Sequence, residues 1–173
     1  MKQSSLWQAA GFALSTLLGT FLHFLYHWTG ESILTAPFSG VNESTWEHMK
    51  LLFWPMLLFA AAQRLFRRER GGFWCVKLRG ILLGLGLIPT LFYTYNGVIG
   101  KSPDWINIAI FYISAALAFL FERWAFKQDL ARCKYSRLAF AVICLVGVLF
   151  IVFTFTPPQI PLFQDPLSGT YGV

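Results

Sequence analysis

Residues 51–70 read LLFWPMLLFAAAQRLFRRER, an apolar run that ends in a cluster of arginines. An apolar stretch of about 20 residues is long enough to cross the hydrocarbon core of a bilayer as a helix. Arg and Lys gather on the cytoplasmic side of such helices. This stretch therefore predicts both a transmembrane helix and its direction.

The composition of the whole chain agrees with a membrane protein. The 173 residues are 56% hydrophobic and only 13% charged, with a mean hydropathy of +0.56. Soluble domains carry about 25% charged residues. The net charge of +6 is not spread along the chain, as a nucleic-acid surface would require, but gathers beside the apolar runs. We therefore expect membrane lipid as a partner and no nucleic acid.

The sequence predicts an all-α fold, a polytopic bundle of five transmembrane helices within residues 1–156. The expected spans are 6–28, 46–66, 73–99, 104–126 and 136–156. The first run is longer than the 7–15 apolar residues typical of a signal peptide, so we interpret it as a retained helix. Residues 157–173 form a second part, a proline-rich, non-helical tail that we expect to fold over the outer mouth of the bundle.

Twelve of the 14 basic residues fall on one side of the predicted bundle, and Lys50 and Lys101 are the exceptions. The positive-inside rule makes that side cytoplasmic, which places the N-terminus inside and the C-terminal tail outside. The twelve are Lys2, Arg64, Arg67, Arg68, Arg70, Lys77, Arg79, Arg123, Lys127, Arg132, Lys134 and Arg137.

The three cysteines show no pattern that indicates chemistry. Cys75, Cys133 and Cys144 form neither a C-x-x-C pair nor a metal-ligand spacing. We predict that they are packing residues that face the membrane or the cytoplasm.

The first helix carries two histidines on a stripe of small residues. Gly11, Ser15, Gly19, His23 and His27 recur every four residues and so share one face. Small residues on such a stripe let a neighbouring helix approach closely. An H-x3-H pair on a helix is a spacing that zinc sites use.

The stretch NESTWEHMK, residues 42–50, supplies further ligands at the start of the next helix. We predict that His23, His27, Glu47 and His48 bind Zn²⁺ or another divalent metal, and that Glu43 and Glu47 act in catalysis. Glu47 is expected to face the first helix, because Glu43 one turn earlier reinforces that face. His48 would then meet Asp165 or Tyr93, and Tyr93 is a third catalytic candidate.

Simpler interpretations of the same stretch remain open. Ser44 and Glu47 match a capping box, in which two side chains satisfy free backbone N–H groups at a helix start. Lys50 lies three residues beyond Glu47 and could pair with it. Such a polar network would lock the first two helices together without binding a metal.

Three motifs together resemble a bacterial family of small integral membrane proteins of unknown function. They are VNESTWEHMK (41–50), FYTYNGVIG (92–100) and PPQIPLFQDPLSGTYG (157–172). This resemblance implies a multi-pass protein of the bacterial plasma membrane. The H-x3-H pair with nearby carboxylates is also similar to transmembrane metal hydrolases of the alkaline ceramidase type, which have about seven helices and serine and aspartate motifs that this chain does not match.

Three functions follow from these patterns. The first is a metal-dependent hydrolase or transferase that acts on a lipid, a lipid-linked group or a lipoprotein. The second is a structural or partner-binding membrane subunit. The third is a proton or metal-ion transporter, which the scarcity of polar residues in the inner half of the bundle disfavours.

The basic residues generate a prediction about topology. Reporter fusions placed after residue 68 and at the C-terminus should report the cytoplasm and the opposite side, respectively, because three spans separate the two positions. Fusions that report the same side at both positions would contradict the five-span arrangement.

Overall fold

The computed structural model describes the chain except residues 1, 68–70, 102 and 129–132. Arg68, Arg70 and Arg132, which contribute to the basic count above, lie outside the described residues. The rest folds into five long α-helices, followed by a short 3-10 helix in the tail, and the described residues contain no β-strand. The elements are α1 (Lys2–Trp28), α2 (Thr45–Arg67), α3 (Phe73–Val98), α4 (Asp104–Ala125), α5 (Ser136–Phe155) and η2 (Pro161–Phe163).

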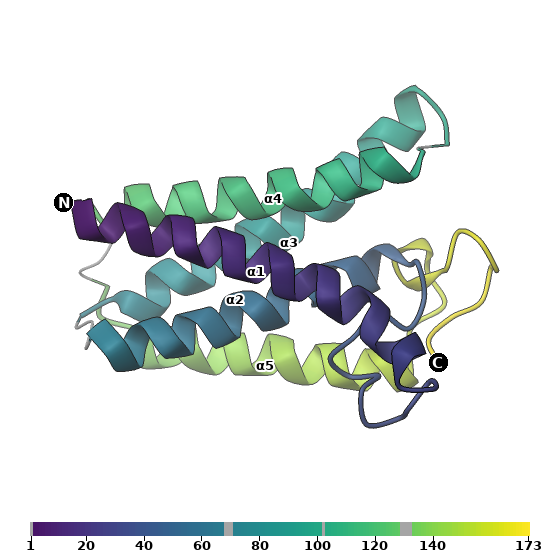
Figure 1. The fold of residues 1–173 in the computed structure, drawn as a ribbon, viewed down its shortest axis with the longest axis horizontal. Coiled ribbons are helices and arrows are strands. Elements are labelled where there is room, and N and C mark those ends of the chain that lie inside the picture. The colour runs from purple at the N-terminus through teal and green to yellow at the C-terminus, as the bar shows by residue number, and fades with distance from the viewer. Residues whose placement is uncertain (1, 68–70, 102, 129–132) are drawn as a thin grey trace.

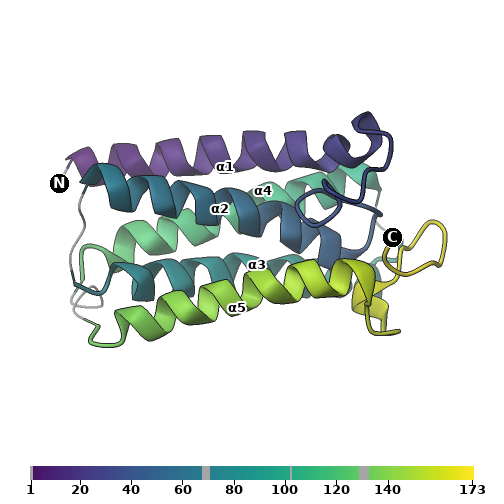
Figure 2. The same ribbon diagram turned by 90° about the horizontal axis from the view of Figure 1, so that it is seen from below.

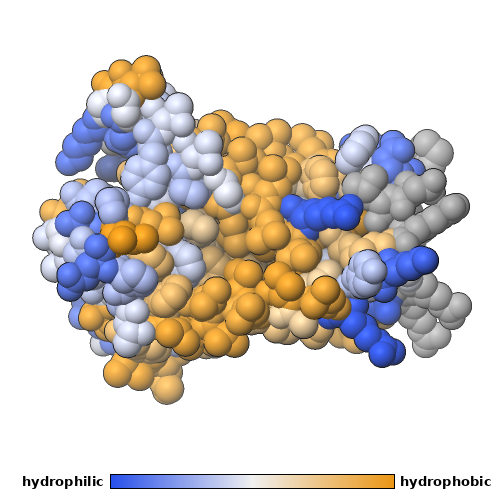
Figure 3. All heavy atoms as spheres, turned by 180° about the vertical axis from the view of Figure 1, so that it is seen from behind, coloured by the Kyte–Doolittle hydropathy of each residue, from blue (hydrophilic) through white to orange (hydrophobic). Residues whose placement is uncertain are grey.

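The five helices lie side by side along the long axis of the molecule, with the N- and C-termini at opposite ends (Figures 1 and 2). Each is long and apolar enough to cross a membrane. The face drawn in Figure 3 carries a broad apolar band between two polar ends. The predicted all-α bundle of five membrane-spanning helices is therefore confirmed.

The stripe of small residues on α1 is a close-packing surface, as predicted. A Cβ atom at Gly11 would come within 2.5 Å of the Phe59 ring and 2.6 Å of the Phe119 ring. At Gly19 it would come within 2.7 Å of Phe111 and 2.8 Å of the Leu51 carbonyl oxygen. These two glycines let α1 lie directly against α2 and α4.

A buried ion pair joins α3 to α4 on the side of the bundle where the basic residues gather. Lys77 Nζ lies 2.6 Å from Glu122 Oε2, and the two side chains are almost completely buried. A charge in an apolar interior is tolerated only with a partner. The pair therefore fixes the register of α3 against α4.

The prediction that all three cysteines are unpaired packing residues is wrong for two of them. Cys75 at the start of α3 and Cys133 before α5 form a disulfide, with their Cα atoms 6.3 Å apart. Cys144 is free and exposed. Disulfides are rare in the cytoplasm, so this bond and the Lys/Arg count give opposite indications for the same end of the bundle. The reporter fusions decide between them.

Candidate functional site

The loop between α1 and α2 is fixed by a lysine buried near the C-terminal tail, at the end of the bundle that is outer in the predicted orientation. Lys50 Nζ lies 2.6 Å from Glu47 Oε2, and it donates hydrogen bonds to the Ala36 carbonyl oxygen at 2.8 Å and to Thr154 Oγ1 at 2.9 Å. The Lys50 side chain is fully buried. One ammonium group thus ties the loop, the first turn of α2 and the last turn of α5 together.

The start of α2 is capped by Ser44 as predicted, but Glu47 does not return the second bond of a capping box, because Asn42 takes the Ser44 N–H. Ser44 Oγ accepts a hydrogen bond from the Glu47 backbone N–H at 3.3 Å. The Asn42 side-chain oxygen accepts one from the Ser44 N–H at 3.0 Å. The Glu47 carboxylate accepts the Val41 N–H at 3.0 Å in addition to its pairing with Lys50. Loop residues 41–44 are therefore fixed relative to the helix.

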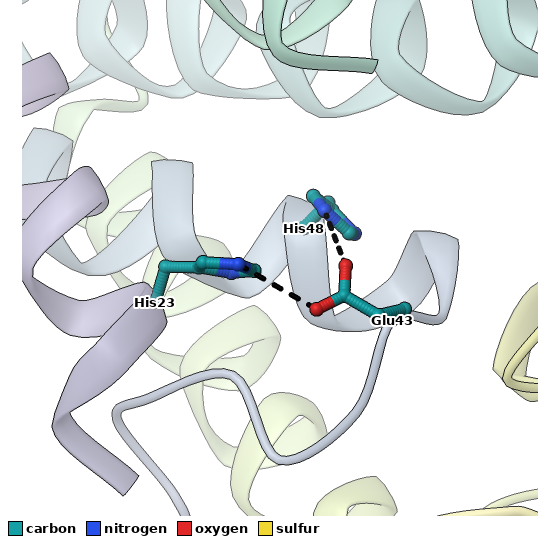
Figure 4. Close-up of side chains that lie close together, drawn as sticks. All are labelled: His23, Glu43 and His48. Atoms are coloured by element: carbon teal, nitrogen blue, oxygen red, sulfur yellow. Dashed lines mark ion pairs between the residues drawn. The ribbon is translucent and has the colours of Figure 1, made fainter. Parts of the chain in front are cut away.

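His23, Glu43 and His48 point toward one another next to this anchored loop (Figure 4). His23 Nε2 lies 3.5 Å from Glu43 Oε1, and His48 Nε2 lies 3.5 Å from Glu43 Oε2. One ligand atom from each residue lies within 4.8 Å of the other two. The two histidines come from α1 and α2, and the glutamate comes from the loop between them.

The separations of these atoms approach those of metal ligands. Ligand atoms on a tetrahedral zinc lie roughly 3.4 Å apart when the bonds are about 2.0–2.2 Å. The two 3.5 Å distances are close to that value, but they run to different oxygens of Glu43. A set with one atom from each residue spreads over 4.8 Å, so the side chains must draw closer together to share one ion. The side chains are between 23% and 41% exposed, so an ion could reach them from outside.

A backbone contact prepares His48 to act as a ligand. The Nδ1 atom of His48 lies 2.9 Å from the Ser44 carbonyl oxygen, an acceptor, so Nδ1 carries the proton. When the ring is neutral, the Nε2 atom that faces Glu43 carries the lone pair that a metal would take. Metal-ligating histidines are oriented in this way by a hydrogen bond from their other nitrogen.

The other predicted site residues lie elsewhere. Glu47 faces Lys50 and the loop, and His48 faces α1, which is the reverse of the expected orientation. The His27 side chain is 64% exposed and lies 3.7 Å from Glu31. It is outside the group because it lies four residues after His23, which is about 6 Å further along α1. Tyr93 is 40% exposed and packs against Phe92.

The group of three lies on the wall of a cavity of about 440 Å³ between α1, α2, α3 and α4. Polar and apolar side chains both line it. The polar lining is Thr20, His23, Glu43, Thr45, His48, Asn96, Lys101, Asp104, Asn107 and Tyr112. The apolar lining includes Phe24, Leu51, Ile88, Phe92, Ile108, Ile110, Phe111 and Leu167.

The sequence did not lead us to predict the cavity residues on α4. Asp104, Asn107 and Tyr112 all line the cavity from α4. They follow the helical period within an otherwise apolar span, and a polar stripe of this kind marks a helix face that turns away from lipid. That spacing is the signal that could have identified them.

The family model for a family of unknown function, DUF6512, matches residues 1–173. The chain belongs to DUF6512. This confirms the resemblance to a family of unknown function. No curated protein and no solved structure matches the chain.

In this DUF6512 chain the tail packs against the start of α2. Asn42 donates a side-chain hydrogen bond to the Gly172 carbonyl oxygen at 3.1 Å, and the rings of Trp46 and Phe163 lie 4.6 Å apart. Asp165 bonds within the tail itself, to the Leu167 N–H at 2.8 Å and Ser168 Oγ at 2.9 Å. Leu167 reaches the cavity lining, so the tail contributes to the wall without bringing Asp165 into the group of three.

The buried lysine generates a stability prediction for this DUF6512 chain. Lys50→Met leaves the Glu47 charge without its partner, which costs about 3–5 kcal/mol in a buried pair. The purified protein in detergent should therefore unfold at a clearly lower temperature, and Glu47→Leu in the same chain should restore part of the loss. Lys101→Met, which changes an exposed lysine, is the control. A Lys50→Met protein as stable as this control would show that the pair does not anchor the loop.

Proposed function

We propose that His23, Glu43 and His48 bind a divalent metal ion, with zinc as the first candidate. The observation that carries this proposal is the convergence of two imidazole nitrogens and a carboxylate within 4.8 Å, from three separate segments. Zinc takes nitrogen and oxygen ligands of these types. The hydrogen bond that orients His48 supports the same role.

The number of ligands favours a catalytic centre over a structural one. Structural zinc sites are closed by four protein ligands, whereas catalytic sites have three and leave a position for water or substrate. A metal in such a site polarises a carbonyl or phosphoryl oxygen and supplies a nucleophile from water at neutral pH. We therefore propose a metal-dependent hydrolase or transferase.

The cavity favours a lipid or lipid-linked substrate. Its lining joins the group of three to a large apolar surface that includes Leu51, Ile88 and Ile110. An amphiphile fits this combination, with its head group at the ligands and its chain against the apolar lining. Asp104 is the other carboxylate in the described lining and is the candidate for proton transfer.

A purely structural role is the second candidate function. Glu43 already bridges the two histidines by contacts of 3.5 Å, and such a bridge joins α1 to α2 without a metal. Interhelical polar contacts in membrane bundles contribute roughly 1 kcal/mol each. In this case the three residues would support stability and would not bind an ion.

Metal titration separates the two functions. Protein stripped with chelator and purified in detergent should bind one zinc ion per chain, and His23→Ala, Glu43→Gln and His48→Ala should each weaken binding by at least about 10–100-fold. His27→Ala is the matched control, since this histidine lies on the same helix outside the group.

Two results would contradict the metal site. One is the absence of stoichiometric zinc binding while the three variants lower the unfolding temperature, which would support the structural role. The other is an equal loss of affinity in His27→Ala, which would place the metal elsewhere.

A further inference from the structure

The wall of the cavity is open toward the membrane between α1 and α4. Thr20 and Phe24 on α1, and Ile108 and Tyr112 on α4, line the cavity, and all four are exposed, as residues at the mouth of an open cavity are. A side chain that meets both the cavity and the surroundings lies at the edge of an opening. Because these four residues belong to two adjacent helices, the opening lies in the side of the bundle.

The two helices touch below this opening and separate above it. Gly19 packs against Phe111, and Thr20 Oγ1 lies 3.2 Å from the Tyr112 hydroxyl oxygen. Toward the end of the bundle that carries the C-terminus, α1 and α4 diverge (Figure 1). The Thr20–Tyr112 hydrogen bond therefore forms the lower edge of the opening.

The opening reaches the depth of the hydrocarbon core. Trp28 and Trp105 lie at the outer ends of α1 and α4 and are each 66% exposed, as is typical of tryptophans at a membrane interface. The lower edge is seven or eight residues further along each helix, or about 10–12 Å deeper. A water-soluble molecule could enter only through the polar outer mouth, whereas a lipid chain has direct access from the side.

The charges at the outer mouth indicate the head group. Glu43, Asp104 and Lys101 are the charged side chains in the described lining. A divalent cation at the group of three makes the formal charge of this lining positive, and an anionic head group is then complementary to it. Metal ions are also common ligands of phosphoryl oxygens.

From these observations we infer that the substrate is a membrane phospholipid whose acyl chain enters the cavity sideways between α1 and α4. The phosphate-bearing head group then lies at His23, Glu43 and His48, and this part of the inference rests on the proposed metal site. The lateral entrance itself rests on the opening alone.

Photocrosslinking in vesicles tests the entrance. Benzoylphenylalanine in place of Phe92 presents the probe on the α3 wall of the cavity, as a conservative replacement for a half-buried aromatic ring. In phosphatidylglycerol vesicles this protein should crosslink to the lipid. The same probe at Phe53, which is fully buried away from the cavity, should not crosslink to lipid. At Phe21, which is 46% exposed, the probe should crosslink to lipid whether or not the cavity is occupied.

Narrowing the opening gives the second arm of the test. Ile108→Trp should lower lipid crosslinking from position 92 several-fold while the zinc affinity stays unchanged, because Ile108 is not a ligand. Added zinc should raise the yield of crosslinked phosphatidylglycerol but not the yield of an uncharged crosslinked diacylglycerol. If the Phe92 probe misfolds, the same probe at Phe111, another aromatic residue of the lining, replaces it.

The outcomes separate this inference from the proposed function. A protein that binds zinc but crosslinks no lipid from positions 92 and 111 overturns the lateral entrance. Lipid crosslinking without any zinc binding supports the entrance and overturns the metal centre. Preferential crosslinking of an acylated peptide added to the same vesicles overturns the assignment to phospholipid.

Discussion

The buried ammonium group of Lys50 is the constraint on which the outer end of this molecule depends. It contacts Glu47 in α2, the Ala36 carbonyl oxygen in the loop and Thr154 in α5. A charge at this depth is stable only when all its donors have partners, so the three segments are held as one unit. Because Glu47 also binds the Val41 N–H, the short path from Val41 to the start of α2 is fixed. Glu43 lies on that path, and its position between two histidines follows.

This arrangement puts polar chemistry at the border between water and hydrocarbon. The group of three is partly exposed, and the cavity beside it has a largely apolar lining and, by our inference, an opening between α1 and α4. A site for a water-soluble substrate needs no such opening. In the proposed function the anchored loop supplies one ligand, and the separation of α1 from α4 gives an amphiphile access.

The helices could be predicted from sequence because a membrane span depends on the length and hydropathy of one continuous segment. The site could be predicted only in part, because it depends on the path of a loop and on helix phase. His23 and His48 converge as ligand candidates, but the carboxylate beside them is Glu43 and not Glu47. The sequence contained the competing signal, since Lys50 three residues after Glu47 is its ion-pair partner. The bond between Cys75 and Cys133 joins residues 58 positions apart, a separation that carries no local pattern.

X-ray absorption at the zinc edge of the zinc-loaded protein tests the central claim most directly, because it reports the atoms bound to the ion. A centre at His23, Glu43 and His48 predicts two imidazole nitrogens and oxygen ligands at about 2.0–2.2 Å. The imidazole contribution should fall by half in His23→Ala and in His48→Ala. A spectrum with sulfur ligands at about 2.3 Å, or one without imidazole, would contradict the account.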